Sequence, residues 1–153
     1  MLKVDKLDIQ ILKELKENSR LSYKEIAKRL RTHPNTLIQR VKKLEKNQII
    51  KKYSIEADYK KLGLEFCAVV MLRTKGIKIT TKKDFERITR LPQVVTLYGI
   101  AGTYDAVAII QVKNMDELTH VISEIQKTPG VLRTTTYLVL EKYKDIDEYN
   151  PFI

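Results

Sequence analysis

The first third of the chain carries apolar residues at helical spacing in three stretches separated by polar turns. The first stretch follows Asp5, repeats Leu7, Ile11 and Leu15 on one face, and ends at Asn18. Apolar residues four positions apart predict an amphipathic helix. The carboxylate of Asp5 suits its start, because a helix dipole is positive at the N-terminus.

The second and third stretches have clear start signals. Ser22 and Glu25 form an S-x-x-E capping box, which predicts a short helix over the residues that follow. The third helix begins at His33-Pro34, where a proline at the first helical position lacks only an N–H that would be unpaired anyway. Two short helices joined by a tight turn predict a helix-turn-helix, whose second helix commonly lies in the DNA major groove.

An extended apolar segment follows the third helix. Ile49, Tyr53 and Ile55 fall on one side of it, which predicts a strand that closes the helical unit. We therefore expect a helix-turn-helix domain of the winged-helix type over residues 1–55. A polar connection is expected over residues 56–63, and a second domain over residues 64–153.

The rest of the chain alternates strand and helix patterns in the order βαββαβ. This order predicts a ferredoxin-like domain, and thus an α+β protein, with a four-stranded antiparallel sheet and both helices on one face. Several strands are apolar on both sides, so we expect the uncovered face to be buried against another subunit. The expected strands are 66–73, 94–100, 105–112 and 131–141, and the expected helices are 82–90 and 115–127.

Charge changes this picture, because it is concentrated in the helical part. Residues 1–61 hold 17 Lys and Arg against 8 Asp and Glu, whereas the remaining residues hold 12 against 11. A basic first third joined to a near-neutral remainder is typical of a polyanion-binding module attached to a domain with another task. The single Cys67 forms no disulfide framework, and neither a signal peptide nor a membrane span is recognisable, so a cytoplasmic protein is expected.

The third helix has an outward face with the chemistry of DNA reading. If its leucines and valine face the core, the opposite side is entirely polar and lacks acids. Asn and Gln can pair with the adenine edge, Thr can contact a thymine methyl, and Lys suits guanine or phosphate. The alternative is a solvated face of the kind that any surface helix has. The predicted base-reading residues are Asn35, Thr36 and Gln39, and the predicted phosphate contacts are Arg40, Lys42, Lys43 and Lys46.

Several motifs together resemble one family. The motifs are Asp5-x-x-Asp8-x-x-Ile11-Leu12, Glu25-Ile26-Ala27, Pro34-x-Thr36, Arg40-Val41-x-x-Leu44-Glu45, Leu62-Gly63, Gly102-Thr103-Tyr104-Asp105 and Arg133-Thr134-Thr135-Thr136-Tyr137. They resemble the Lrp/AsnC regulators, also called feast/famine regulatory proteins. The resemblance implies a DNA-binding transcription regulator whose C-terminal domain dimerises, assembles further to as many as eight copies, and often senses an amino acid. A homodimer implies a palindromic operator in double-stranded DNA.

The chain departs from the family pattern at four positions. Arg31 stands where the family usually has a glycine in the turn, and His33 stands where it usually caps the recognition helix with serine. Gln48 stands where a glycine commonly ends that helix, so we expect Asn47 to take the left-handed conformation instead. Thr103 replaces the usual acid of the hairpin.

The resemblance also implies an effector site near the hairpin and the last strand. A carboxylate beside hydroxyls and backbone N–H groups can hold the ammonium and carboxylate of an amino acid. The alternative is a plain turn, in which Gly102 permits the bend and Asp105 satisfies its backbone. The implied effector residues are Tyr98, Gly102, Thr103, Tyr104, Asp105, Thr135, Thr136 and Tyr137.

Other kinds of function fit the sequence less well. His33 and His120 have no ligand spacing, so we expect no metal and no cofactor, and no catalytic set can be assembled. An enzyme is therefore not expected. An effector-independent regulator and an amino-acid-sensing scaffold stay open, although a scaffold would not need an acid-free helix face. An RNA-binding sheet would need aromatic residues where this one has Val, Ile and Ala.

Overall fold

The computed structural model describes residues 3–75, 85–144 and 151. The chain divides into two compact units: the first comprises Met1–Glu56 with Lys144–Ile153, and the second comprises Ala57–Tyr143. Each unit has its own cluster of buried apolar side chains. The two units are described separately below.

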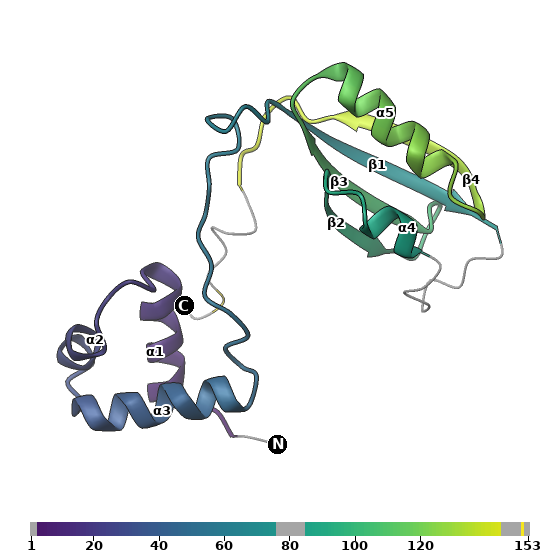
Figure 1. The fold of residues 1–153 in the computed structure, drawn as a ribbon. Helices are drawn as coiled ribbons and strands as arrows, with labels where there is room; N and C mark the ends of the chain where they lie inside the picture. The colour runs from purple at the N-terminus through teal and green to yellow at the C-terminus, as the bar shows by residue number, and fades with distance from the viewer. Residues whose placement is uncertain (1–2, 76–84, 145–150, 152–153) are drawn as a thin grey trace. The chain divides into compact units, whose positions relative to one another are not determined.

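The first unit consists of three helices (Figure 1). They are α1 (Lys6–Glu17), α2 (Tyr23–Arg29) and α3 (Pro34–Lys46). The helical spacing seen in the sequence explains their arrangement, because the apolar side of each helix faces the same core. The buried residues of this core are Ile11, Leu12, Leu15, Ile26, Ala27, Leu37, Val41 and Leu44.

Side-chain caps fix where these helices start. The Ser22 hydroxyl accepts a hydrogen bond from the Glu25 backbone N–H at 3.2 Å, and the Ser22 N–H donates to the Glu25 carboxylate at 2.8 Å. Asp5 and Asp8 form the same reciprocal arrangement at α1. Each box satisfies backbone N–H groups that would otherwise lack a partner. The predicted capping box of the second helix is thus confirmed.

The turns around α3 use left-handed residues that are not glycine. Arg31 has φ +50° in the turn before the helix, and Gln48 has φ +56° after it. Asn47 has φ −90°, so the expectation that Asn47 takes the left-handed conformation is wrong. The helix continues one residue further than expected, because the Asn47 N–H still donates to the Lys43 carbonyl at 3.1 Å, and the reversal therefore falls on Gln48.

The predicted strand over residues 49–55 is also wrong. This segment pairs with no strand in the part of the chain that the structure describes. A strand needs a partner for its backbone groups, and its alternating pattern alone does not supply one. Two residues instead fix the segment to the helices: Ile50 packs against the first core, and the Tyr53 hydroxyl donates to the Glu45 carboxylate at 2.8 Å.

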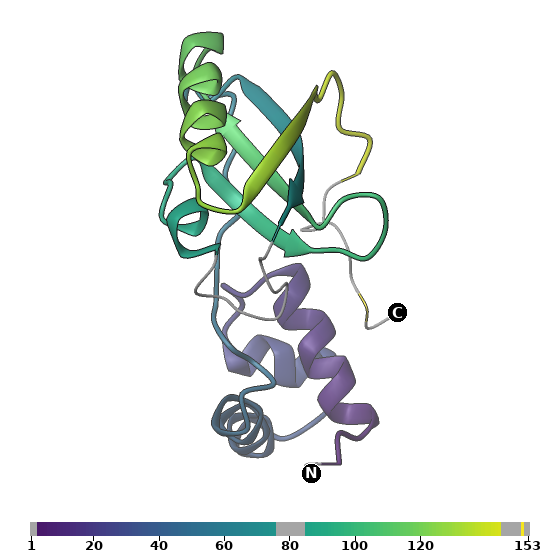
Figure 2. The ribbon, with the colours of Figure 1, turned by 90° about the vertical axis from the view of Figure 1, so that its right-hand side faces the viewer.

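The second unit is a four-stranded antiparallel sheet with helices on one face (Figures 1 and 2). Its strand order is β2-β3-β1-β4, as expected for a βαββαβ ferredoxin-like domain. The elements are β1 (Phe66–Thr74), α4 (Glu86–Thr89), β2 (Val94–Gly99), β3 (Ala106–Val112), α5 (Met115–Gln126) and β4 (Val131–Leu138). The last strand ends at Leu138, three residues before the predicted end. Of the helix expected over 82–90, residues 82–84 lie outside the described residues.

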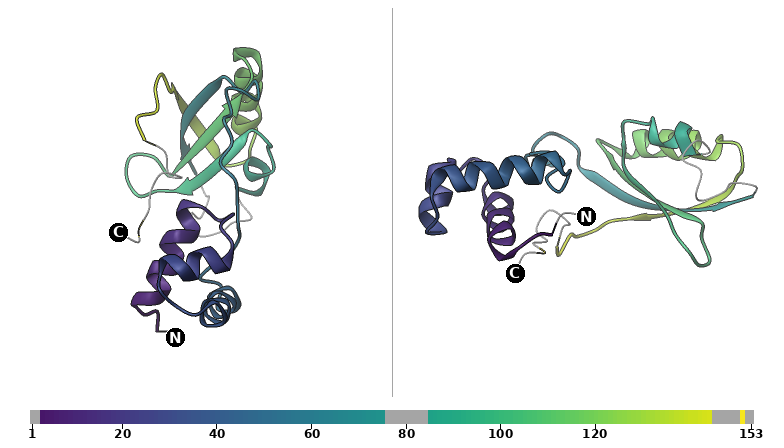
Figure 3. Two further views of the ribbon diagram at one scale, coloured as in Figure 1. Left: turned by 90° about the vertical axis from the view of Figure 1, so that its left-hand side faces the viewer. Right: turned by 90° about the horizontal axis from the view of Figure 1, so that it is seen from below.

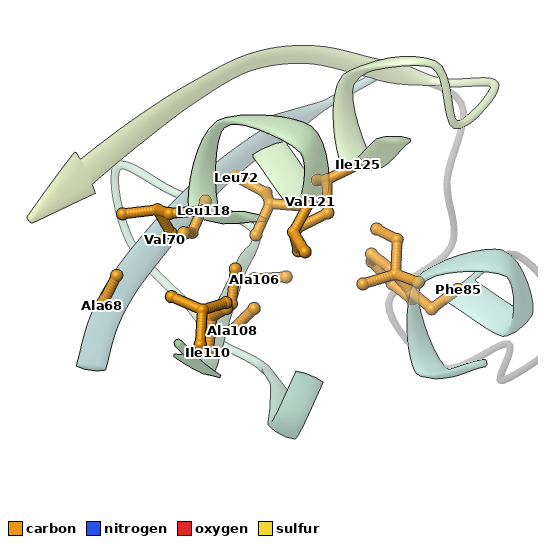
Figure 4. Close-up of a cluster of buried hydrophobic side chains, with 12 residues drawn as sticks. Ala68, Val70, Leu72, Phe85, Ala106, Ala108, Ile110, Leu118, Val121 and Ile125 are labelled. Carbon is orange, nitrogen blue, oxygen red and sulfur yellow. The ribbon is translucent and has the colours of Figure 1, made fainter. Parts of the chain in front are cut away.

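Alternate residues of the central strands form the second core. Val70 and Leu72 of β1 and Ile110 of β3 lie on the face of the sheet that packs against Val121 and Ile125 of α5 (Figure 4). All five side chains are fully or almost fully buried. Successive side chains of a strand point to opposite faces, so the residues between them must lie on the other face of the sheet.

That other face, called the open face below, carries no helix of the described unit (Figure 3). Its centre consists of two cross-strand rows. The register aligns Thr96, Ile109, Val69 and Tyr137 in one row, and Tyr98, Val107, Met71 and Thr135 in the next. Four of these residues are aliphatic or Met, and the side chains at the edges, Tyr98 and Tyr137, are 58% and 55% exposed. Soluble proteins rarely leave an apolar sheet face of this kind exposed to water.

Candidate nucleic-acid interface and effector site

The outward side of α3 is a continuous polar surface. All six residues expected there from helical geometry, namely Asn35, Thr36, Gln39, Lys42, Lys43 and Lys46, are exposed. The buried residues of the helix all lie on its opposite side. The structure therefore leaves the amide, hydroxyl and ammonium groups of these residues available to a ligand. We call them the α3 surface.

The single acid of α3, Glu45, does not belong to the α3 surface. Glu45 is half-buried, and its carboxylate accepts the hydrogen bond from the Tyr53 hydroxyl. Burial and this carboxylate raise the pKa of Tyr53 above its ordinary value of 10.0, so the hydroxyl stays protonated and able to donate. The bond thus ties the Glu45 side chain to the segment that follows α3.

His33, which stands where the family pattern usually has serine, caps the start of α3. The Asn35 backbone N–H donates to Nδ1 of His33 at 3.2 Å. An imidazole nitrogen therefore accepts the hydrogen bond that a side-chain oxygen of Ser, Thr, Asp or Asn commonly accepts at a helix start.

Arg40 is placed differently from the other residues predicted to contact DNA. Its Nη1 donates to Asp5 Oδ2 at 2.6 Å and to Asp8 Oδ1 at 2.8 Å, and its side chain is 30% exposed. The guanidinium and the Asp8 backbone N–H hold the pKa of Asp5 below its ordinary value of 3.8. In the described structure Arg40 therefore joins α3 to the start of α1, and it is not part of the α3 surface.

The β2–β3 hairpin, residues 100–105, is hydrogen-bonded to β1 and β4. The Thr74 backbone N–H and hydroxyl both donate to Asp105 Oδ2, at 2.7 and 3.2 Å. The Tyr104 hydroxyl donates to the Thr135 hydroxyl at 3.3 Å. The loop curves away from the strand ends in Figure 2. These contacts gather Tyr104, Asp105 and Thr135, three of the residues implied for an effector site.

The other implied effector residues do not lie together at one place on the second unit. Tyr98 lies on β2, three strands away from β4, a separation of about 14 Å at the usual strand spacing. Thr136 pairs with Val70 and so faces the helices, whereas Thr135 and Tyr137 lie on the open face. Gly102 has φ +146° and Thr103 is exposed at the tip of the hairpin. One small ligand within a single copy cannot reach all eight residues.

The register also brings together two residues that sequence reasoning did not connect. Arg73 and Arg133 are direct cross-strand partners at the end of β1 and β4, and both are exposed. Alternation from Met71 and Thr135 places them on the open face, beside the hairpin. The sequence shows one arginine near the end of the first expected strand and one near the start of the last. It does not show that these strands are neighbours, and only the strand register pairs the two residues.

Comparison with known proteins decides the family. Residues 4–45 match the AsnC-type helix-turn-helix domain, and residues 67–149 match the Lrp/AsnC ligand binding domain. The chain belongs to the Lrp/AsnC family. The Lrp/AsnC relatives include the HTH-type transcriptional regulator LrpC of Bacillus subtilis, 34% identical over 97% of this chain and 98% of LrpC. They also include LysM of Saccharolobus solfataricus, 31% identical over 92% of this chain and 96% of LysM. The first unit is therefore the DNA-binding part of a transcription regulator.

Solved structures of Lrp/AsnC proteins agree with the fold. Escherichia coli AsnC matches with a TM-score of 0.85 at 28% identity, over 95% of this chain and 99% of AsnC. A transcriptional regulator of Neisseria meningitidis, solved as its L-Met complex, matches with a TM-score of 0.86 at 26% identity, over 94% of each chain. Within the described part of this Lrp/AsnC chain, no helix is long and apolar enough to cross a membrane.

Proposed function

We propose that this Lrp/AsnC protein reads a palindromic operator as a homodimer and that an amino acid modulates this binding. The observation that carries the DNA part is the α3 surface, which offers exposed amide, hydroxyl and ammonium groups and no exposed acid. In this proposal Asn35, Thr36 and Gln39 contact base edges, and the three lysines contact phosphates. The role of Arg40 is to hold α3 against α1.

The dimer part of the proposal rests on the open face. Its aliphatic rows are half-exposed in one copy, and covering them with the same rows of a second copy would remove them from water. A twofold axis through two such sheets would present two α3 helices to DNA, which favours half-sites about one helical turn apart. Further assembly to an octamer would use surfaces other than this one.

The effector part rests on the hairpin and on the L-Met complex of the Neisseria relative. Tyr104, Asp105 and Thr135 gather hydroxyls and a carboxylate at one end of the sheet. A ligand bound there shifts assembly only by its difference in affinity between two states, typically about 1 to 3 kcal/mol. An effector-independent regulator is the alternative, because the contacts of Asp105 are also those of a plain structural turn.

The first experiment is a salt titration of DNA binding with the full chain. Affinity for duplex DNA should fall steeply with salt, since each neutralised phosphate releases a counterion. Reversing two charges, Lys42→Glu with Lys46→Glu, should abolish binding at moderate salt. The control Lys113→Glu with Lys144→Glu changes two exposed lysines outside α3 and should retain most of the affinity. Equal losses in both variants would reject the α3 surface as the interface.

A further inference from the structure

We infer that the effector of this protein is an acidic amino acid, held by Arg73, Arg133 and Asp105 at the end of the open face. The inference rests on the proposed function, because it names the chemical class of ligand for the same hairpin region. It depends on three observations: the register of the two arginines, their lack of partners, and the position of the hairpin carboxylate.

The two arginines lie side by side on one surface. Arg73 of β1 and Arg133 of β4 occupy one row of the antiparallel ladder, directly after the row of Met71 and Thr135 on the same face. Paired residues in such a ladder have Cβ atoms about 5 Å apart and side chains on the same side. Both residues are thus exposed and leave the sheet on the same face, one row beyond Thr135, which bonds Tyr104.

Neither arginine has a carboxylate partner among the described residues. The two arginines on the helix side of the same unit differ: Arg87 pairs with Glu124 at 3.2 Å, and Arg90 pairs with Glu86 at 2.5 Å. Like charges directly opposite each other destabilise a sheet. A pair of adjacent, unpaired guanidinium groups is therefore suited to bind carboxylates, which an arginine can hold through two parallel hydrogen bonds.

Asp105 adds one negative charge at the same end. Its backbone N–H donates to the Leu72 carbonyl at 2.9 Å, which continues the β1–β3 ladder toward Arg73. Alternation from Val107 places its side chain on the open face. The two bonds from Thr74 hold the carboxylate in place, and a carboxylate with about four acceptor positions can accept further N–H donors.

These three charges define the ligand. Two guanidinium groups and one carboxylate complement a molecule with two carboxylates and one ammonium, which is an acidic amino acid such as glutamate or aspartate. Glutamine and asparagine lack one of the carboxylates, and a plain dicarboxylate such as glutarate lacks the ammonium. An aliphatic side chain would leave one guanidinium without a partner.

The proposed dimer is compatible with this site. The aliphatic rows lie toward the middle of the open face, whereas the arginines lie at its end. If a second copy covered the arginines as well, it would bury two unpaired like charges, which is strongly unfavourable. We therefore expect this end of the sheet to stay accessible.

The test is calorimetric titration of the full-length protein with five probes: L-glutamate, L-aspartate, L-glutamine, L-asparagine and glutarate. One acidic amino acid should bind at least about tenfold more tightly than its amide and than glutarate, because each lost charged contact weakens binding by that order. Arg73→Gln and Arg133→Gln should each weaken binding by a similar factor. The matched control Arg90→Gln, which removes an exposed arginine from the helix side, should leave affinity within about twofold.

Several outcomes would overturn the inference. These are an amide or glutarate that binds as tightly as the acidic amino acid, arginine variants with unchanged affinity, and arginine variants that lose the dimer instead of the ligand. DNA binding without effector separates this failure from failure of the proposed function. If operator binding persists and a neutral amino acid modulates it, only the ligand class is wrong. If no amino acid binds, the effector part of the proposed function fails too.

Discussion

The α3 surface and the open face are both exposed, and their chemistry is opposite. The α3 surface consists of amides, a hydroxyl and three lysines, whereas the centre of the open face consists of Val, Ile and Met. A charged surface attracts a polyanion over several ångströms and responds to salt. An apolar surface acts only on contact and is largely insensitive to salt. The difference fits the two partners that we propose, DNA for the first unit and a second copy of the chain for the second.

The largest expected effect comes from placing a charge on the open face. Ile109→Asp should convert the proposed dimer into a monomer at micromolar concentration, because an unpaired buried carboxylate destabilises an interface by several kcal/mol. Light scattering gives the mass, and circular dichroism checks that the variant stays folded. Thr119→Asp, on the exposed side of α5, is the matched control and should remain a dimer. A wild-type monomer would remove the comparison altogether.

Substitutions on the α3 surface should separate base reading from phosphate contact. Gln39→Ala should weaken binding to the operator by about 1 to 3 kcal/mol and leave random DNA unaffected. Lys46→Ala should weaken both alike and reduce the salt slope by about one. Fluorescence anisotropy with the two DNAs at several salt concentrations measures both effects. Identical profiles for the two variants would show that the surface does not read sequence.

The ion pair of Arg40 gives the first unit a pH dependence of its own. The folded pKa of Asp5 lies below its unfolded value, so its contribution to stability is present above about pH 4 and is lost as the pH falls through the folded pKa. Asp5→Asn keeps a capping side chain but cannot titrate. This variant should be less stable than the wild type at pH 7, and the gap should close toward pH 2 in thermal unfolding. Glu17→Gln, elsewhere on α1, should show no such convergence.

The smallest expected effect concerns the turn after α3. Gln48 holds a left-handed conformation that glycine adopts without strain, so Gln48→Gly should stabilise the first unit by about 0.5 to 1 kcal/mol. The neighbouring substitution Asn47→Gly, at a residue with negative φ, should destabilise it by a similar amount. Chemical denaturation of both variants checks the sign. The open face should be unaffected in either case.

Features set by neighbouring residues could be predicted from the sequence. The capping box of Ser22, the start of α3 at Pro34 and the apolar run that forms β1 all arise within a few positions, and the structure has each of them. The apolar pattern of residues 49–55 was equally local, but a strand depends on a partner, and the described chain provides none. Local pattern thus predicts an element only when the element satisfies its own backbone.

The parts of the site that could not be predicted depend on distant pairs. Arg40 sits close in angle to the α3 surface, but Asp5 and Asp8, more than thirty positions earlier, hold its guanidinium. Thr136 falls on the helix face because of the register of β4 against β1. The same register brings Arg73 beside Arg133. Each case requires knowledge of which elements meet, which spacing within one segment does not contain.

The carboxylate of Asp5 has two roles, since it caps α1 and also receives Arg40. Positions 5 and 40 should therefore be mutationally coupled: the pair they share is lost only once, so the double variant should be less damaged than the sum of the single ones. The coupling is partial, because Arg40 also pairs with Asp8 and Asp5 also caps α1. In evolution such a pair is free to change only together or through a weakened intermediate. The helix that we propose reads DNA is thus constrained from within the protein, through the ion pairs of Arg40 with Asp5 and Asp8, and variation in operator preference should accumulate around Arg40 while Arg40 itself stays fixed.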